Sequence, residues 1–342
     1  MENWIICENE DSNIILSTRV RLARNLKGYP FPNKISKEKA EEVIAKVKEV
    51  LLTNDYLKGK INISNLSDIN DIEKDIYFEN HLISKKLIEN KEISALAIDD
   101  KEIMSIMINE EDHVRLQLIC GGLHLKELYE EVNKLDDILE EKLDFAYDAN
   151  LGYLTACPTN TGTGLRASVM LHLPALCMTK EIDNIFAAIG KVGITIRGMY
   201  GEGSKGYGSI FQISNQITLG QSEDEIINGL TAMIYQIIEK ENLARNQLKE
   251  QYNYEIQNKV MRALGILKSA IILDYRECME LLSLVRLGND LGFIENVNKE
   301  LLNRLMIQAS VPVIKSKFDE DVRSREINIY RAKIFREQLK DM

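Results

Sequence analysis

The sequence predicts an α/β (α+β) fold in which a sheet-containing portion is followed by an all-helical one. Two observations support the first part: short apolar runs typical of strands lie within 93–120 and 195–214, and an amphipathic helix pattern precedes them at 36–52. A third observation supports the second part, because beyond about residue 250 only helical spacing remains. We therefore expect two domains, one at 1–248 and a helical one at 249–342.

The first elements follow from the spacing of apolar side chains. Helical spacing within 36–52 is set by Ala40, Val43, Ile44, Val47 and Leu51. Residues 93–98 and 103–108 are predicted to form a strand pair with a turn between them, and 115–120 a further strand. A long polar helix is expected across 125–147.

The later elements of the first domain are a helix, two strands and a long helix. We place them at 164–176, 195–197, 210–214 and 222–245. Ser222 and Glu225 form a capping box, which predicts where the last of these helices begins. Beyond it, apolar residues that recur every three to four positions predict shorter helices joined by polar turns.

Composition excludes several classes of protein. A net charge of −10 argues against nucleic-acid binding, which needs a basic face. The five cysteines are scattered and form no Cys-x-x-Cys pair, so we expect neither a disulfide framework nor a zinc ribbon. There is no apolar run of membrane-spanning length, and we expect no secretory signal. The sequence is typical of a protein of the reducing cytoplasm that binds no membrane.

Arginine residues gather in short polar motifs, of which the first is STRVR at 17–21. In an extended strand, residues two apart share a face, so Arg19 and Arg21 would hold one anion together. The guanidinium group suits this role because it forms paired hydrogen bonds with phosphate oxygens and keeps its charge. A solvated surface pair is the alternative for an isolated Arg-x-Arg.

A second motif, NEEDHVR, covers 109–115. Extended geometry would place Glu111, His113 and Arg115 on one face, with a carboxylate beside a cation. An acidic turn between two strands is the alternative, and it is the simpler interpretation of this motif alone.

The third motif begins at Cys157 and reads CPTNTGTG, with Arg166 close behind. Its threonines, glycines and cation suit a bound anion. An arginine nearby and a helix beginning at Gly164 would both favour the thiolate of Cys157. Groups with apolar neighbours are expected to be structural instead: Cys120, Cys177 and His172.

A fourth motif, at 197–206, contains the pattern Gly-x-Gly-x-x-Gly. A dinucleotide-binding fingerprint needs a helix directly after it, and the strand expected at 210–214 excludes that function. The chain also lacks a Walker A sequence and the His-Arg-Asp and Asp-Phe-Gly motifs of protein kinases. A flexible hairpin remains, but it does not explain why Arg197 and Glu202 bracket the loop.

Taken together and in this order, the motifs resemble those of the phosphagen (guanidino) kinase family, and within it the bacterial protein-arginine kinases of the McsB type. The matching segments are STRVRLARN at 17–25, NEEDHVR at 109–115, CPTNTGTGLRASV at 157–169 and RGMYGEG at 197–203. They cover roughly residues 14–245. The resemblance implies a catalytic domain at 1–248 with an antiparallel sheet flanked by helices, and a helical domain at 249–342.

The resemblance also implies roles for individual residues. Glu111 and Glu202 would hold the guanidinium group of the substrate, and Cys157 would lie beside it. His81 would lie near the nucleotide. ATP would be bound by Ser17, Thr18, Arg19, Val20, Arg21, Arg115, Arg166, Ala167, Ser168, Val169, Met170, Arg197, Gly198, Met199, Tyr200, Gly201 and Glu202.

These roles imply ATP-dependent phosphorylation of arginine side chains in proteins, which would mark them for degradation. A protonated guanidinium is a poor nucleophile, so two carboxylates would orient it and one would take its proton. Five arginines would stabilise the transferred phosphoryl group, and Mg²⁺ would be held mainly through the ATP phosphates. The thiolate of Cys157 would act electrostatically and not covalently.

The resemblance implies partners as well. These are protein substrates with an exposed arginine, a second copy of the chain, an activator protein (McsA) and a Clp protease. One departure from the family pattern concerns its C-terminal Arg-Asp-x-x-Arg-Ala motif, which binds phosphoarginine. Here only Arg331 and Ala332 of that motif are present. Two alternatives stay open: a kinase for free arginine or another small guanidine, and a weakly catalytic adaptor that binds phosphoarginine.

Overall fold

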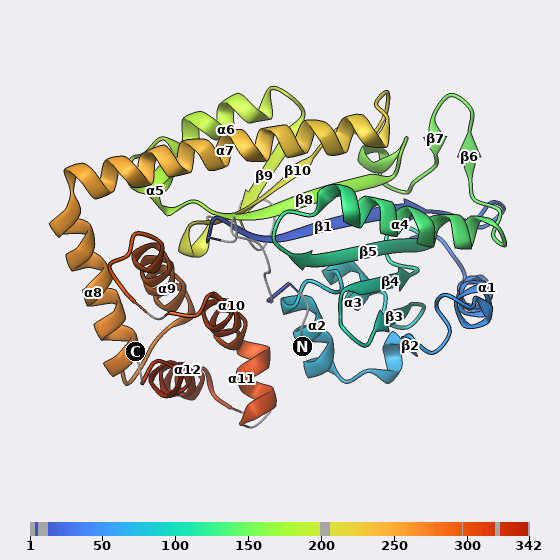
Figure 1. The fold of residues 1–342 in the computed structure, drawn as a ribbon. Helices are drawn as coiled ribbons and strands as arrows, with labels where there is room; N and C mark the ends of the chain where they lie inside the picture. The colour runs from blue at the N-terminus through green and yellow to red at the C-terminus, as the bar shows by residue number, and fades with distance from the viewer. Residues whose placement is uncertain (1–3, 6–12, 199–205, 296, 319–321, 341–342) are drawn as a thin grey trace. The chain divides into compact units, whose positions relative to one another are not determined.

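The computed structural model describes residues 4–5, 13–198, 206–295, 297–318 and 322–340 (Figure 1). The chain forms two compact units. The first comprises 1–4, 18–168 and 214–231, and the second comprises 5–17, 169–213 and 232–342. Among the described residues, no helix is both long and apolar enough to cross a membrane.

The central element is an eight-stranded sheet with the order β2-β3-β4-β5-β1-β8-β10-β9. Its strands are β1 (Ile15–Arg24), β2 (Ile61–Asn65), β3 (Ala95–Asp99), β4 (Met104–Ile108), β5 (Val114–Gly121), β8 (Leu165–His172), β9 (Ile194–Gly198) and β10 (Ile210–Asn215). The pairs β2–β3, β3–β4 and β4–β5 are antiparallel. The antiparallel sheet expected for the catalytic portion is confirmed.

The predicted strands at 93–120 and 195–214 are all present, with small shifts at their ends. β6 (Tyr147–Asp148) and β7 (Gly152–Tyr153) form a separate two-stranded hairpin in the first unit. Short 3₁₀ helices occur at η2 (Leu66–Asp68), η3 (Pro158–Asn160) and η4 (Tyr207–Ser209).

The first unit contains the helices α1 (Lys37–Thr53), α2 (Asp71–Glu79), α3 (Lys85–Glu89) and α4 (Leu125–Glu140). α1 agrees with the predicted helix, and Ser36 caps its N-terminus through the Lys39 N–H group. α4 ends seven residues earlier than the predicted 125–147. The chain turns there because Phe145 pairs with Leu26 beside the end of β1, and Ala146 donates a hydrogen bond to the Asn25 carbonyl.

The helix predicted at 164–176 is wrong. Residues Leu165–His172 form strand β8, and only Pro174–Met178 form a short helix, α5. β8 lies between β1 and β10 and is buried on both faces, so its sequence shows no polar alternation. A continuous apolar run of this length fits a buried strand as well as a helix, and the neighbouring strands decide between them.

The second unit also contains α6 (Ile182–Gly190), most of α7 (Glu223–Gln251), and the helices that end the chain. These are α8 (Asn253–Ser269), α9 (Tyr275–Asp290), α10 (Lys299–Gln308), α11 (Val311–Lys317) and α12 (Ser324–Gln338). The helical C-terminal region is thus confirmed. The capping box is present as well, because Ser222 Oγ accepts the Glu225 N–H and the Glu225 carboxylate accepts the Ser222 N–H. The boundary between residues 248 and 249 stays a prediction.

A buried ionic network joins α5, α7 and α9 within this unit. Arg245 contacts Glu241 at 2.7 Å and Asp290 at 2.9 Å. The Glu241 carboxylate accepts the N–H groups of Ala175 and Leu176, at the first turn of α5. A carboxylate at this position satisfies amide donors that have no partner inside the helix.

Candidate active site

Four arginines lie on three neighbouring strands of the sheet. Arg19 and Arg21 are on β1, Arg115 is on β5 and Arg166 is on β8. Arg19 and Arg21 are half-buried, whereas Val20 between them is fully buried, so the two arginines share a face as the sequence predicted.

The charges of these arginines act on one another. Burial, followed by the charges of Arg115 and Arg166, lowers the pKa of Arg19 to about 10. Burial and the same like charges hold the pKa of Arg21 well below its usual range, and its buried Nε lacks a hydrogen-bond acceptor in the described structure. The charged forms of Arg19 and Arg21 are thus destabilised by neighbouring arginines, and a group of cations of this kind suits a multiply charged anion.

His81 lies beside these cations, in a turn after α2 with a backbone φ of 62°. Burial, and then the charges of Arg19 and Arg21, lower the pKa of its imidazole to about 3. The ring is therefore neutral in the working pH range. Its buried Nε2 has no partner among the described residues, and the ring centroid lies 6.0 Å from that of Trp4.

The segment 109–113 is bent, so the extended face of Glu111, His113 and Arg115 is absent and the alternative, an acidic turn between two strands, is present. Asn109 has a φ of 57° and starts the bend between β4 and β5. The carboxylate that contacts Arg115 is Glu110, with Nη1–Oε2 at 2.8 Å. The Glu110 side chain is almost fully buried and also accepts hydrogen bonds from Ser84 and from the Glu111 N–H.

Glu111 is half-buried, and its carboxylate is set apart from that ion pair. Burial, and then the charges of Glu110 and Asp112, raise its pKa. In the described part of the chain its carboxylate makes no hydrogen bond or ion pair. A carboxylate with a raised pKa is a better proton acceptor than an exposed glutamate.

Asp112 joins the acidic bend to the segment that precedes Cys157. Its Oδ1 atom accepts hydrogen bonds from Asn25 Nδ2 at 2.6 Å and from the Ala156 N–H at 2.7 Å. Asn25 in turn donates to the Leu154 carbonyl and accepts the His113 N–H. Three distant stretches of chain are thus held in one arrangement around buried side chains.

Cys157 is half-buried and precedes the 3₁₀ helix η3. Its Sγ lies 3.0 Å from Thr159 Oγ1, and its carbonyl accepts the Thr155 hydroxyl. The α-helix expected to begin at Gly164 and to favour the thiolate is absent, because β8 begins at Leu165.

The remaining predicted nucleotide ligands on β1 and β8 have buried side chains. Thr18 donates to the Gly122 carbonyl at 2.5 Å and Ser168 to the Arg19 carbonyl at 3.4 Å. The buried set comprises Ser17, Thr18, Val20, Ala167, Ser168, Val169 and Met170. Their side chains pack in the core, so their contribution to a nucleotide site would come from positioning the arginines between them.

Part of the fourth motif lies outside the described residues. Arg197 and Gly198 end β9, in the second unit. Met199, Tyr200, Gly201 and Glu202 are outside the described residues.

Arg331 is buried in the C-terminal helices. It donates hydrogen bonds to the carbonyls of Ala309 and Leu273 and to Asn328 Oδ1. Ala332 beside it is fully buried. In this arrangement the Nε and Nη1 atoms of Arg331 hold α12 to neighbouring segments.

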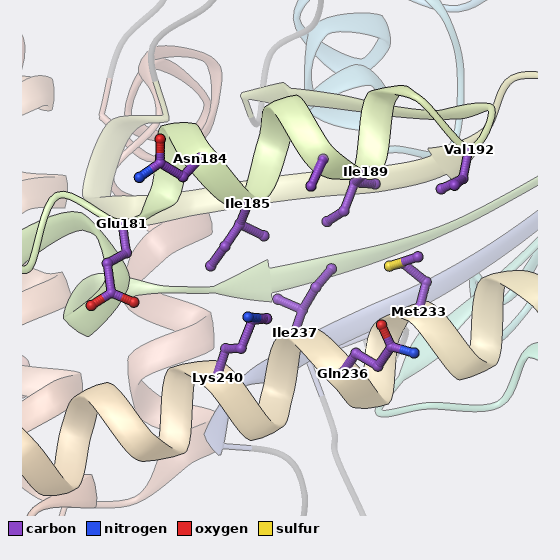
Figure 2. A pocket seen from close by; sticks show the side chains of 10 residues that line it. Glu181, Asn184, Ile185, Ile189, Val192, Met233, Gln236, Ile237 and Lys240 are labelled. Carbon is purple, nitrogen blue, oxygen red and sulfur yellow. The ribbon is translucent and has the colours of Figure 1, made fainter.

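A pocket of about 410 Å³ lies between α6 and α7 (Figure 2). Ile185 and Ile189 of α6 face Met233 and Ile237 of α7, with Lys240 at one end. Its apolar lining includes none of the predicted site residues. Among the described residues, no group of three or more His, Cys, Asp or Glu side chains is placed to hold a metal ion.

Comparison with known proteins identifies the family. Residues 42–244 match the model of the ATP:guanido phosphotransferase C-terminal catalytic domain, and residues 253–342 match that of the protein-arginine kinase McsB C-terminal domain. A protein-arginine kinase of Clostridium novyi is 50% identical over 340 residues, covering 99% of both chains. One from Clostridium acetobutylicum is 47% identical over 340 residues, covering 99% of this chain and 100% of the relative. The chain belongs to the protein-arginine kinase family.

Solved structures of more distant guanidino kinases share the fold. Lombricine kinase superposes with a TM-score of 0.60 at 24% identity, covering 69% of this chain and 68% of its own. The duplicated taurocyamine kinase from Schistosoma mansoni, with bound transition state analogue components, gives a TM-score of 0.60 at 22% identity, covering 94% of this chain and 43% of its own. At these identities the likeness concerns the fold alone.

Within this member of the protein-arginine kinase family, sequence reasoning missed Glu110, Asp112 and Asn25. Each is almost fully buried and makes a polar contact that shapes the site. The available signal was the density of acidic residues at 110–112. Three adjacent carboxylates cannot all be solvated in a tight bend between two core strands, so some must have buried partners.

Proposed function

We propose that the chain is an ATP-dependent protein-arginine kinase, which transfers the γ-phosphoryl group of ATP to a guanidinium nitrogen of arginine side chains in proteins. The cluster of Arg19, Arg21, Arg115 and Arg166 carries this proposal. Burial and the charges of the other arginines lower the pKa of Arg19 and of Arg21, while Glu110 offsets the charge of Arg115. A triphosphate would relieve that repulsion, and ATP is the phosphoryl donor that the family implies.

The arginines supply the charge that the reaction needs. As the bond between the γ-phosphorus and the bridging oxygen breaks, negative charge grows on the ADP that leaves and stays on the phosphoryl oxygens. Positioned guanidinium groups stabilise both, and Arg197 joins them in this proposal. Mg²⁺ bound to the ATP phosphates would supply further neutralising charge, since the described carboxylates form no cage for it.

The acceptor side consists of Glu111, Glu202 and Cys157. The two carboxylates orient the substrate guanidinium, and one takes the proton released as the new N–P bond forms. The raised pKa of Glu111 supports this residue as proton acceptor. Cys157 lies beside the guanidinium and favours its positive charge. Asp112 positions the chain just before Cys157 relative to the bend that carries Glu111.

The wider role is part of the same proposal. The protein acts in the cytoplasm, in stress response and protein quality control, by marking proteins for a Clp protease. It works as a homodimer with an activator protein of the McsA type. Arg331 and Ala332 are a remnant of the phosphoarginine receptor, although the hydrogen bonds of Arg331 within the chain favour a structural role for that arginine.

The test is a phosphoryl-transfer assay with Mg-ATP and either an unfolded protein or free arginine as acceptor. We expect acid-labile phosphoarginine on the protein. Label on free arginine alone would support the small-guanidine kinase, and binding of phosphoarginine peptides without any label would support the adaptor.

Glu111→Gln and Glu202→Gln separate catalysis from nucleotide binding. Each should lower turnover by at least about 100-fold, because general acid–base catalysis contributes about 10²–10⁴-fold, while ATP binding stays largely intact. A variant with full turnover would remove that carboxylate from the proposed mechanism.

A further inference from the structure

Four large apolar side chains are exposed on segments next to the Cys157 loop. Tyr147 and Leu151, on the β6–β7 hairpin, are 61% and 46% exposed. Ile217 and Leu219, in the segment after β10, are 44% and 49% exposed. We call these four residues the apolar ledge. Exposed apolar groups are unremarkable singly, but a group of them on connected segments marks an interaction surface.

The hairpin is joined to the Cys157 loop through backbone contacts. Tyr153, the cross-strand partner of Tyr147, exchanges two backbone hydrogen bonds with Gly162. Gly152 packs so closely on Gly162 that a Cβ atom would collide with its backbone. Cys157 is four positions after Tyr153 in the chain, so their Cα atoms lie within about 14 Å.

The segment after β10 is joined to the same loop. The Thr218 hydroxyl donates to the carbonyls of Thr159 at 3.0 Å and Thr161 at 2.8 Å. The Thr218 carbonyl accepts the Thr163 N–H at 3.0 Å. Ile217 and Leu219 flank this threonine. Both exposed side chains therefore belong to a segment that is hydrogen-bonded to Thr159, two positions after Cys157.

The chain that leads into the hairpin is strongly acidic. Between residues 136 and 153 the sequence has six carboxylates and one lysine, Lys142. Asp136 is paired with Arg24, and the exposed Asp144 lies 3.8 Å from the Lys27 ammonium group, but Glu140 and Glu141 are exposed and Asp148 is half-buried. A partner that complements this surface carries both apolar and basic side chains.

We propose that the apolar ledge binds the polypeptide that flanks the target arginine of a protein substrate, as an extended segment with apolar and basic residues. This inference rests on the proposed function, because the target arginine has to reach Cys157. An extended chain advances about 3.3 Å per residue. The residues within about four positions of that arginine are therefore the ones that meet the ledge.

Two double variants test the ledge, Tyr147→Ser with Leu151→Ser, and Ile217→Ser with Leu219→Ser. Leu52→Ser is the matched control, because Leu52 is 54% exposed on α1 and outside the ledge. The probe is a short fluorescent peptide with one central arginine between leucine and lysine residues. We expect its Kd to rise about tenfold in each double variant, from the loss of two apolar contacts, and to stay unchanged in the control.

Phosphorylation assays give the matching kinetic result. The ledge variants should raise KM for the same peptide about tenfold while turnover of a blocked single arginine stays at the wild-type level. An equal loss with both acceptors would mean that the substitutions disturb the Cys157 loop itself, and would overturn the inference.

The remaining outcomes separate this inference from the proposed function. If both double variants keep the wild-type affinity for the peptide, the inference that the apolar ledge binds the substrate polypeptide is overturned. The wild type could instead show an increase in mass with protein concentration that the variants lose while their peptide affinity is unchanged. That result would assign the surface to contact with a second copy of the chain and would also overturn the inference. If the wild type forms no phosphoarginine on any acceptor, the proposed function fails, while ledge-dependent peptide binding still supports a polypeptide site.

Discussion

Arg21 and Arg24 occur three residues apart on β1, and their surroundings are opposite. Arg21 lies among like charges, with a buried Nε that lacks an acceptor in the described structure. Arg24 contacts Asp136 at 2.6 Å, donates to the Thr163 carbonyl and lies over the ring of Tyr153. Arg21 is thus arranged to bind an external anion, whereas Arg24 is already paired with the carboxylate of Asp136.

Replacing each arginine by glutamine should therefore have opposite effects. Arg24→Gln leaves Asp136 buried without its cation and should lower the free energy of unfolding by about 3 kcal/mol. Arg21→Gln removes repulsion, so stability without nucleotide should be equal or slightly higher. Its ATP affinity should fall at least about tenfold, because a charge-assisted hydrogen bond is lost.

Urea unfolding and the thermal shift on adding Mg-ATP measure these effects. The shift reports affinity because a ligand that binds only the folded state stabilises it according to its Kd. A destabilised Arg21→Gln variant with a normal ATP shift would instead show that Arg21 is structural.

At this scale the sequence predicted side chains on regular strands better than those on bends. The shared face of Arg19 and Arg21 follows from strand alternation alone. The partner of Arg115 does not, because it depends on the φ of 57° at Asn109, which brings Glu110 and not Glu111 to the guanidinium. Asn109 is a residue type that tolerates such angles, but its sequence context does not require one.

Among the elements, β8 is the one whose type was wrongly predicted and the one that links two polar regions. It carries Arg166 near its start and His172 at its end. The amphipathic helix α1 was predictable because its stripe of apolar residues is a local property. The conformation of β8 was not, because its apolar run fits a helix or a buried strand, and the strands that pair with it, β1 and β10, are distant in sequence.

His172 makes the stability of this region depend on pH. It is fully buried, with Nε2 2.7 Å from Ser283 Oγ and no partner at Nδ1 in the described structure. Burial, and then the charges of Arg286 and Arg245, hold its pKa well below 6.5. As pH falls below 6.5 the unfolded chain takes up a proton that the folded chain does not, so stability falls. Above that pH both forms are neutral and the effect is absent.

His172→Gln should remove this dependence. Between about pH 6.5 and pH 5 the wild type should lose up to about 1 kcal/mol per pH unit more than the variant. Urea unfolding of both proteins across that range measures the difference, and the other histidines contribute equally to both. Parallel pH profiles would contradict a folded-state pKa below 6.5 for His172.

For the whole molecule, the predicted domain boundary at residue 248 can be compared with the positions of the buried ion pairs. The division separates Arg245 from Asp290, although the two side chains form an ion pair at 2.9 Å. We expect a fragment of residues 249–342 to form helices but to unfold more readily than a fragment of 232–342, which keeps Glu241 and Arg245. The difference should be at least about 1 kcal/mol.

Circular dichroism during urea unfolding of the two fragments measures this. Arg245→Gln in the longer fragment is the control, and it should bring the unfolding midpoint towards that of the shorter one. Equal midpoints for both fragments would place the natural boundary at residue 248, as the sequence predicted.

The order of strands in the sheet has a consequence for synthesis of the chain. β1 is the first strand made, yet it lies in the middle of the sheet, and its contacts with β8 join residues such as Arg19 and Ser168, which are 149 positions apart. At about 5–20 residues per second, β1 leaves the ribosome roughly 7–30 s before the residues that pair with it. During that interval its apolar side chains and its unpaired backbone N–H and C=O groups are open to wrong partners. This member of the protein-arginine kinase family is therefore prone to aggregation while it is being synthesised.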